Sequence, residues 1–179
     1  DLNLSHSTVA LSADGVQLPD GAVLAWEHVA KITESENGCF AIENGQPRKI
    51  QAYSEETGRA FSLYPTTGAP TMLLSGLPMH RIKDTEPHRD TLAKIKAAAI
   101  RGGRVLDTAT GVGYTAIEAA KAAEHVVTIE IDPAAQLVCR QNPWSQALFD
   151  NPKITQIIGD SYEEVEKFGA GEFSRIVHD

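Results

Sequence analysis

Cysteine is scarce in this chain of 179 residues, which contains Cys39 and Cys139 and no other. Two cysteines are too few for a small disulfide-stapled fold. They lie far apart in the sequence and match no spacing of metal ligands, so we expect no metal site. We therefore interpret both as reduced thiols of a cytoplasmic protein.

Long hydrophobic runs are also missing. No stretch approaches the roughly 20 consecutive apolar residues that span a bilayer. The chain starts with Asp1 rather than Met, and its polar first residues lack the basic start and apolar core of a signal peptide. Hydrophobic residues (42%) and charged residues (22%) nevertheless occur at ordinary globular levels, which excludes a disordered chain. We expect a globular protein with no membrane partner.

Positive charge is in short supply, because 16 lysines and arginines stand against 24 acidic residues for a net charge of −8. Such a chain is a poor non-specific binder of nucleic acid or anionic membranes. Residues 81–104 are the exception, with seven basic and three acidic side chains and a local charge of +4. This segment fits either a solvated helix face or an anion-binding patch, so nucleic acid is not excluded as a partner. The basic residues are Arg81, Lys83, Arg89, Lys94, Lys96, Arg101 and Arg104.

Residues 1–75 contain short apolar runs separated by turn signals. Among these signals, the Asn-Gly pairs at 37–38 and 44–45 favour hairpins. We predict a short helix and three strands of one small antiparallel sheet, over residues 25–34, 39–42, 49–53 and 60–64. This part of the sequence therefore indicates a small β-rich N-terminal domain.

In residues 76–179, helical patterns alternate with strand patterns. This alternation predicts βαβ units and a parallel sheet. The predicted strands begin at Val105 and cover 125–130, 154–158 and 173–177. The predicted helices cover 91–100, 115–123, 163–168 and a segment after Asp132-Pro133. Because βαβ units wind with one hand, the C-terminal ends of the strands share the edge where open α/β sheets bind ligands. We predict a Rossmann-like α/β domain.

An acidic residue ends each of the four predicted strands, at Asp107, Glu130, Asp160 and Asp179. After the first strand comes a turn with Gly111 and Gly113, which let the backbone bend sharply and approach a ligand. Glu130 suits the hydroxyls of an adenosine ribose, and Asp160 suits an exocyclic amine such as that of adenine. Asp160 also fits a helix N-cap, as Asp132 does. The set predicts a cradle for a positively charged nucleoside.

Two cofactors fit this pattern. The spacing Gly111-x-Gly113-x-x-Ala116, with Glu130 after the second strand, matches a dinucleotide turn and hydride transfer with NAD. Asp107, however, stands where a dinucleotide turn has buried apolar strand, and its negative charge suits a cationic ligand better than a pyrophosphate. S-adenosylmethionine has an amine, a sulfonium and an adenosine but no phosphate, and we favour it over NAD. A non-catalytic scaffold is a further alternative.

The motif at residues 107–113, Asp-Thr-Ala-Thr-Gly-Val-Gly, is followed by the acids that end the next three strands. In this order and spacing, the motifs resemble those of class I S-adenosylmethionine-dependent methyltransferases, and the resemblance covers residues 91–179. Ala109 stands where that family has its first glycine. The resemblance implies a seven-stranded Rossmann-like fold and transfer of a methyl group from S-adenosylmethionine to an acceptor that the sequence does not identify.

The resemblance also implies a role for each motif residue. The methionine end of the cofactor would contact Asp107 and the turn, at Ala109, Thr110, Gly111 and Gly113. The ribose would bind at Glu130 beside Ile131, and adenine at Asp160 beside Ser161. Asp179 would face the methyl acceptor as a catalytic base or as an orienting residue.

Residues 72–90 are laid out as in spermidine synthases, which have a β-stranded N-terminal domain and transfer an aminopropyl group from decarboxylated S-adenosylmethionine. Asp84 keeps an acid of that family, whereas Met79, His88 and Asp90 replace its glutamine, tyrosine and glutamate. The whole layout is more similar to predicted methyltransferases of archaeal type. Methyl transfer is therefore the first hypothesis and aminopropyl transfer the alternative.

The same resemblances bear on partners and completeness. An N-terminal β domain often pairs subunits in these families, which makes a homodimer one alternative, and the sequence leaves the oligomeric state open. His80 and His88 would line the entrance to the substrate site, and Arg81 and Arg89 would bind an acidic acceptor.

Because the fourth strand of the class I fold lies inside its sheet, an end at Asp179 would expose an apolar edge. We therefore expect the chain to be a fragment.

Overall fold

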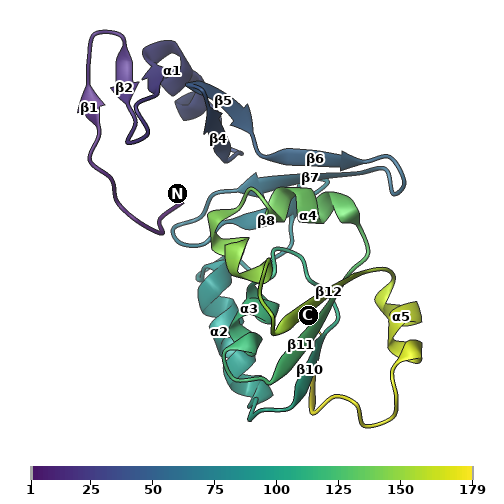
Figure 1. Cartoon of the computed structure of the whole chain (residues 1–179). Coiled ribbons are helices and arrows are strands. Elements are labelled where there is room, and N and C mark those ends of the chain that lie inside the picture. Colours follow the sequence, from purple (N-terminus) through teal and green to yellow (C-terminus); the bar gives the residue numbers. More distant parts are fainter. Residues whose placement is uncertain (1, 179) are drawn as a thin grey trace.

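A computed structural model describes residues 2–178 and contains two kinds of β-sheet (Figure 1). Antiparallel sheets occupy the N-terminal part of the chain, and one parallel sheet with helices occupies the C-terminal part. This arrangement confirms the predicted α/β class, a Rossmann-like parallel sheet preceded by antiparallel β structure. The domain boundary between residues 75 and 76 stays a prediction, and the last antiparallel strand runs past it to Pro78.

The first antiparallel elements are a three-stranded sheet, one helix and a hairpin. They are β1 (Ala10–Leu11), β2 (Gly15–Gln17), β3 (Val23–Ala25), α1 (Trp26–Glu34), β4 (Phe40–Glu43) and β5 (Gln46–Lys49). Asn44 and Gly45 connect β4 to β5 with positive φ angles of 53° and 76°, which confirms one hairpin prediction. The other Asn-Gly pair, at 37–38, joins α1 to β4, so the second hairpin prediction is wrong.

A second antiparallel sheet follows, formed by β6 (Gln51–Ser54), β7 (Arg59–Tyr64), β8 (Thr71–Leu74) and β9 (Leu77–Pro78). The predicted single strand over 49–53 is wrong, because the chain changes sheet at Ile50. The buried Ile50 donates its amide to the Cys39 carbonyl (2.9 Å), and its own carbonyl accepts from the Leu63 amide (3.0 Å). Ile50 therefore links two antiparallel sheets instead of continuing one.

The parallel sheet has the strand order β12-β11-β10-β13. Its strands are β10 (Arg104–Asp107), β11 (His125–Glu130), β12 (Ile154–Ile158) and β13 (Arg175–Val177), and all neighbours are parallel. All four predicted strands are present, and their C-terminal ends meet at one edge. Among the described residues β13 pairs only with β10, and Ile176 is 62% exposed there.

Helices cover both faces of the parallel sheet (Figure 1). They are α2 (Pro87–Ala98), α3 (Tyr114–Ala120), α4 (Pro133–Cys139), α5 (Ser161–Glu164) and the 3₁₀ helices η1 (Pro143–Leu148) and η2 (Val165–Lys167). On one face, Val105 and Val126 share a core with α2 and α3. On the other face, Leu106 and Val127 share a core with Phe168. No helix between residues 2 and 178 has the length and apolar character needed to cross a membrane.

Helix α2 begins four residues earlier than predicted because Glu86 caps it. The Glu86 carboxylate accepts hydrogen bonds from the amides of His88 (3.0 Å) and Arg89 (2.6 Å), and Pro87 occupies the first turn. The helix ends at Ala98, where Ala99 adopts a left-handed conformation. Helix α2, which precedes the parallel sheet, therefore has a defined start at Glu86 and a defined end at Ala99.

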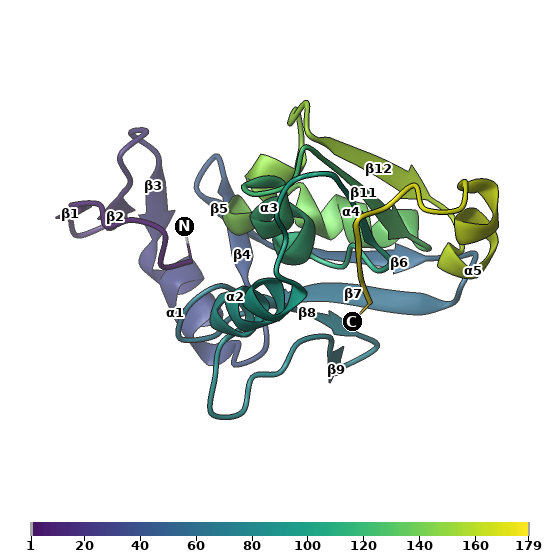
Figure 2. The ribbon, with the colours of Figure 1, turned by 90° about the horizontal axis from the view of Figure 1, so that it is seen from below.

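Helix α4 joins the parallel sheet to the second antiparallel sheet, and it lies along β6 and β7 (Figure 2). It begins as predicted, since Asp132 accepts a hydrogen bond from the Ala134 amide (2.9 Å). Ala135 and Val138 of α4 belong to one buried cluster with Leu63 and Met72 of the antiparallel strands. The two sheets therefore share a continuous core through α4.

Candidate functional site

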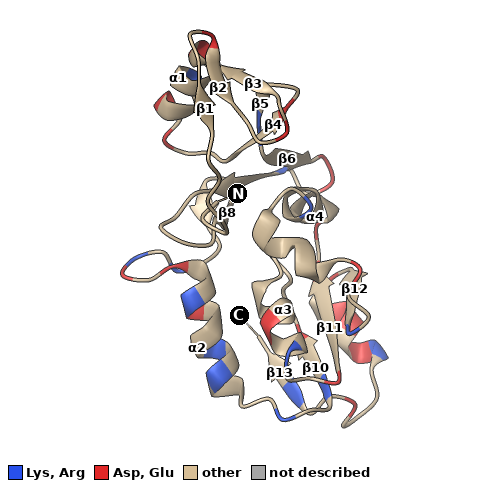
Figure 3. Ribbon diagram, turned by 60° about the vertical axis from the view of Figure 1, so that its left-hand side comes forward, with Lys and Arg blue, Asp and Glu red and all other residues tan. Residues whose placement is uncertain are grey.

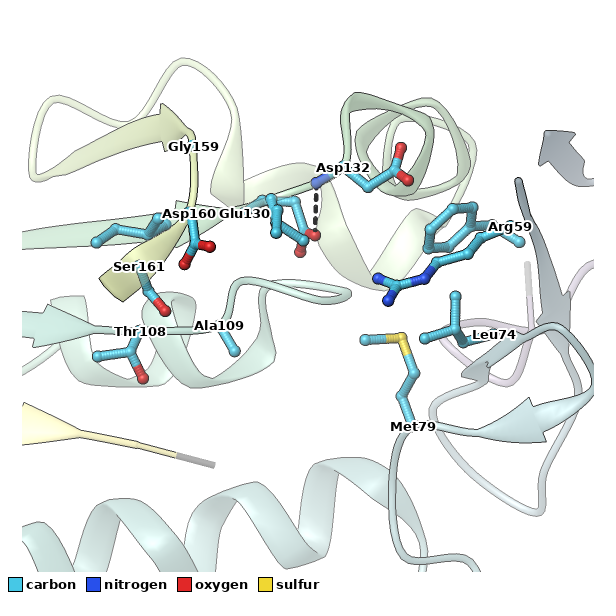
Figure 4. Close-up of a pocket in the computed structure, with 13 residues that line it drawn as sticks. Arg59, Leu74, Met79, Thr108, Ala109, Glu130, Asp132, Gly159, Asp160 and Ser161 are labelled. Atoms are coloured by element: carbon cyan, nitrogen blue, oxygen red, sulfur yellow. Dashed lines mark hydrogen bonds between the residues drawn. The ribbon is translucent and has the colours of Figure 1, made fainter. Parts of the chain in front are cut away.

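A cavity of about 220 Å³ lies where the C-terminal ends of β10, β11 and β12 approach the second antiparallel sheet (Figure 4). Five of the residues predicted to bind a cofactor line this cavity: Ala109, Glu130, Ile131, Asp160 and Ser161. Thr108, Ile129, Asp132 and Gly159 complete the wall on this side. The edge of the parallel sheet thus brings residues from the ends of three strands into one cavity.

Glu130 ends β11 and contributes a buried carboxylate to the cavity wall. Its side chain is 7% exposed, and its Oε2 accepts a hydrogen bond from the Gly111 amide (2.9 Å) while its Oε1 accepts one from the Asp132 amide (3.1 Å). Burial raises the pKa of this carboxyl, and the two amide hydrogen bonds offset the rise only in part. Glu130 therefore ties the glycine turn to the start of α4 and presents hydrogen-bond acceptors to the cavity.

Asp107 ends β10 beneath the cavity wall. Its side chain is fully buried, and Thr128 donates a hydrogen bond to its Oδ2 (2.8 Å). Because the Thr128 hydroxyl gives its one proton to Asp107, it must accept in its second hydrogen bond. The Thr110 hydroxyl is therefore the donor in the 2.7 Å contact between the two threonines. Asp107, Thr110, Gly111 and Gly113 do not line the cavity, but Asp107 precedes Thr108 and Ala109, which do. The structure thus places the negative charge of Asp107 directly behind the turn.

The glycine turn needs glycine at both positions, because Gly111 and Gly113 have φ angles of 52° and 81°. Its amides bond within the protein. The Thr110 amide donates to the Ile129 carbonyl (2.8 Å), the Gly113 amide to the Thr110 carbonyl (2.7 Å), and the Gly111 amide to Glu130. Three backbone amides of the turn are therefore already bonded within the protein.

Asp160 and Ile131 form the part of the wall beyond Glu130. The Asp160 Oδ1 accepts a hydrogen bond from the Tyr162 amide (2.9 Å), so Asp160 caps α5, and the same side chain faces the cavity (Figure 4). Ile131 is 49% exposed, which leaves an apolar surface in the wall. An exposed carboxylate beside an apolar surface suits a planar heterocycle that carries an amine.

The opposite wall comes from the second antiparallel sheet, through Arg59, Phe61, Leu74 and Met79. None of these four residues was predicted from the sequence to line a site, because nothing local shows how the antiparallel strands dock on α4. Met79 drew notice only as the residue that replaces a glutamine of the spermidine-synthase layout. The docking itself rests partly on Thr57, whose hydroxyl donates to Asp132 Oδ2 (2.5 Å). Burial alone would raise the pKa of Asp132, but the hydrogen bonds from Thr57 and the Ala134 amide lower it.

The two histidines predicted to line the entrance have other contacts. His80 lies 2.9 Å from the Thr71 hydroxyl, and its ring packs against Tyr114. His88 bonds to Glu118 (3.0 Å) and packs against the ring of Trp144. Neither histidine is among the residues that line the cavity.

Asp179, the predicted catalytic residue, lies outside the described residues. The last described residue, His178, lies 2.7 Å from the hydroxyl of Thr108, measured from its Nδ1. Because Thr108 belongs to the cavity wall, this contact brings the end of β13 to the same site.

The basic segment over 81–104 contains α2, which carries Arg89, Lys94 and Lys96, and the loops on either side of it (Figure 3). Within it, Lys94 pairs with Asp90 (2.9 Å) and Arg104 pairs with Glu172 (2.6 Å). The predicted acceptor-binding residues Arg81 and Arg89 are exposed. None of the basic residues of this segment lines the cavity.

Comparison with solved structures shows the fold. Over 84% of this chain and 58% of the other, the structure is similar to a spermidine synthase in complex with the transition state analogue AdoDATO, with a TM-score of 0.57 and 19% identity. Spermidine synthase from Thermotoga maritima matches over 79% of this chain and 53% of its own, with a TM-score of 0.55 and 20% identity. Identities this low show a Rossmann-like methyltransferase fold and no more.

Comparison of sequences shows the family. The chain is 37% identical over 164 residues to the uncharacterized protein MJ1233 of Methanocaldococcus jannaschii, a match that covers 91% of this chain and 55% of that protein. The chain thus spans little more than half the length of the curated relative. Residues 77–179 match the family described as "Conserved hypothetical protein 95". The chain belongs to this methyltransferase-like family, and the comparisons support a class I fold for it.

Proposed function

We propose that this chain is the adenosyl-binding part of an S-adenosylmethionine-dependent methyltransferase with an unidentified acceptor. The observation that carries the proposal is the placement of Glu130. Its carboxylate is held by two backbone amides at the end of β11 and lines the same cavity as Asp160 at the end of β12. Two acceptor groups on neighbouring strands match the ribose hydroxyls and the adenine amine of one nucleoside.

When bound, S-adenosylmethionine supplies a methyl group that is already activated on a sulfonium. The protein therefore contributes mainly alignment and exclusion of water. Glu130 and Asp160 would hold the adenosyl part of the cofactor, which would supply its methyl group to the acceptor and leave as the thioether. An acceptor that carries a proton must lose it to a base, the role we propose for Asp179. The buried charge of Asp107, behind Thr108 and Ala109, favours a cationic group over that part of the wall.

The dinucleotide alternative has less support. A pyrophosphate on the glycine turn would lie beside the Glu130 carboxylate, which accepts the Gly111 amide, and the amides of Thr110 and Gly113 also bond within the protein. Aminopropyl transfer is the second candidate because the fold, with its antiparallel sheet over the cavity, is that of spermidine synthases. Against it, His88 and Asp90 are engaged in contacts with Glu118 and Lys94.

Isothermal titration calorimetry tests the proposal. We expect the chain to bind S-adenosylmethionine and S-adenosylhomocysteine, with decarboxylated S-adenosylmethionine binding more weakly. Glu130→Gln keeps one acceptor for the amides and should lower affinity at least about tenfold, the size of one lost charged hydrogen bond. Glu124→Ala is the matched control and should bind like wild type. Glu124 is exposed and directly precedes β11, so it lies at the opposite end of the strand from Glu130.

Three results would contradict the proposal. A folded protein that gives no heat with any adenosyl ligand would exclude the proposed cofactor. Enhanced NADH fluorescence would favour the dinucleotide alternative. Tighter binding of the decarboxylated ligand would favour aminopropyl transfer.

A further inference from the structure

Arg59 is a positively charged side chain in a cavity whose other charged residues are all acidic. It begins β7, and its guanidinium points into the space between Glu130 and Met79 (Figure 4). Between residues 2 and 178, the guanidinium makes no hydrogen bond or ion pair, although its positive charge helps to lower the pKa of the nearby Asp132 carboxyl. An arginine carries five N–H donors and accepts nothing, so its position leaves these donors to solvent or to a ligand.

The position of Arg59 relative to Glu130 is fixed through Asp132. Thr57, in the turn between β6 and β7, donates to the Asp132 carboxylate (2.5 Å), and the Asp132 amide donates to Glu130 Oε1 (3.1 Å). Asp132 is fully buried. The turn that carries Arg59 and the carboxylate at the end of β11 are therefore linked by consecutive hydrogen bonds through one buried residue.

The pair of Arg59 and Glu130 has a defined chemical preference. Glu130 accepts hydrogen bonds and Arg59 donates them, so a ligand group between them must do both. A hydroxyl is the simplest such group, since it has one proton to give and two lone pairs to share. An anionic phosphate fits poorly, because the Glu130 carboxylate would repel it and the turn amides are already bonded.

We propose that Arg59 binds the ribose hydroxyls of the adenosyl ligand together with Glu130. Arg59 donates to the hydroxyl oxygens while Glu130 accepts their protons, so the vicinal diol is recognised from both sides. This inference rests on the proposed function. It makes the second antiparallel sheet a part of the ligand site and gives the site a preference for ribose over deoxyribose.

The test compares S-adenosylhomocysteine with its 2′-deoxy and 3′-deoxy analogues by calorimetry, on wild type, Arg59→Met and Arg59→Lys. Arg48→Met is the matched control, because Arg48 pairs with Glu43 on the surface and does not line the cavity. We expect Arg59→Met to bind S-adenosylhomocysteine about tenfold more weakly, as for loss of one charged hydrogen bond. The same variant should change binding of at least one deoxy analogue less than about threefold. Arg59→Lys should fall between, and Arg48→Met should match wild type.

The possible failures are distinguishable. If wild type binds S-adenosylhomocysteine but Arg59→Met weakens all three ligands equally, or none of them, the diol inference is wrong and the proposed function stands. If wild type binds none of the three, the proposed function fails first and the inference with it. A thermal midpoint of Arg59→Met close to that of wild type excludes misfolding as the cause, which we expect because the exposed guanidinium makes no hydrogen bond and loses only its attraction to Asp132.

Discussion

The geometry of the glycine turn between β10 and α3 predicts how much unfolding free energy a Gly113→Ala substitution would cost. Gly113 has a φ of 81°, in the left-handed region that L side chains rarely adopt. An added Cβ would also lie 2.7 Å from Cδ2 of Leu148, a side chain that is 1% exposed and therefore has little room to move. We expect Gly113→Ala to strain both the backbone and the core.

A second glycine separates these two costs. Gly171 has a φ of 75°, but nothing lies within 4 Å of the Cβ that alanine would add there. Gly171→Ala therefore measures backbone strain alone, about 1–2 kcal/mol. Overpacking a filled core adds about 1–3 kcal/mol. The free energy of unfolding should thus fall by about 1–2 kcal/mol in Gly171→Ala and by about 2–5 kcal/mol in Gly113→Ala.

Urea denaturation, followed by the fluorescence of Trp26 and Trp144, measures both values. In a chain of this size, the larger loss corresponds to a thermal midpoint lower by roughly 4–20 °C. Equal losses in the two variants would refute the reasoning that Leu148 confines Gly113. A Gly113→Ala variant as stable as wild type would refute the left-handed geometry of the turn itself.

Two further predictions concern contacts that hold the site in place. Thr57→Val removes the donor to the buried carboxylate of Asp132 and should cost about 1–3 kcal/mol of unfolding free energy, whereas Thr57→Ser should cost little; equal effects in a denaturation assay would contradict this. Burial alone would raise the pKa of Glu118, but hydrogen bonds from Lys121 and His88 hold it below its ordinary value of 4.5. Because the folded-state pKa is the lower one, this stability is present above about pH 4.5 and is lost as the pH falls through the folded-state pKa. Glu118→Gln should therefore show a flatter dependence of unfolding free energy on pH between roughly 5 and 3 than wild type, and identical slopes would exclude the contribution.

The parallel half of the site could be predicted because its information is local. The pattern over 125–130 gives β11 with the bounds that the structure has, and Asp132-Pro133 gives the start of α4. Parallel strands end at one edge, so acids at the ends of successive strands must come together there. Glu130 and Asp160 share a cavity for that reason.

The antiparallel half could not be predicted in the same way. Arg59 reaches the cavity only because its hairpin docks on α4, and the contact between Thr57 and Asp132 joins residues 75 positions apart. No periodicity or motif reports such a contact. The prediction that the histidines line the entrance rests only on their position before the parallel-sheet domain in the sequence, and that position does not reveal the contacts of His88 with Glu118 and Trp144.

One buried cluster positions both halves of the site, and this limits how a ligand can enter. The cluster contains Phe61 and Met72 of the antiparallel sheet together with Val112 of the glycine turn and Cys139 of α4. The Cys139 thiol donates to the Gly111 carbonyl (2.9 Å), so a hydrogen bond connects α4 to the glycine turn. Moving the antiparallel wall away from the turn would expose this cluster, at about 25 cal/mol for each Å² of apolar surface. We therefore expect ligands to enter through the open end of the cavity, with both sheets staying in contact.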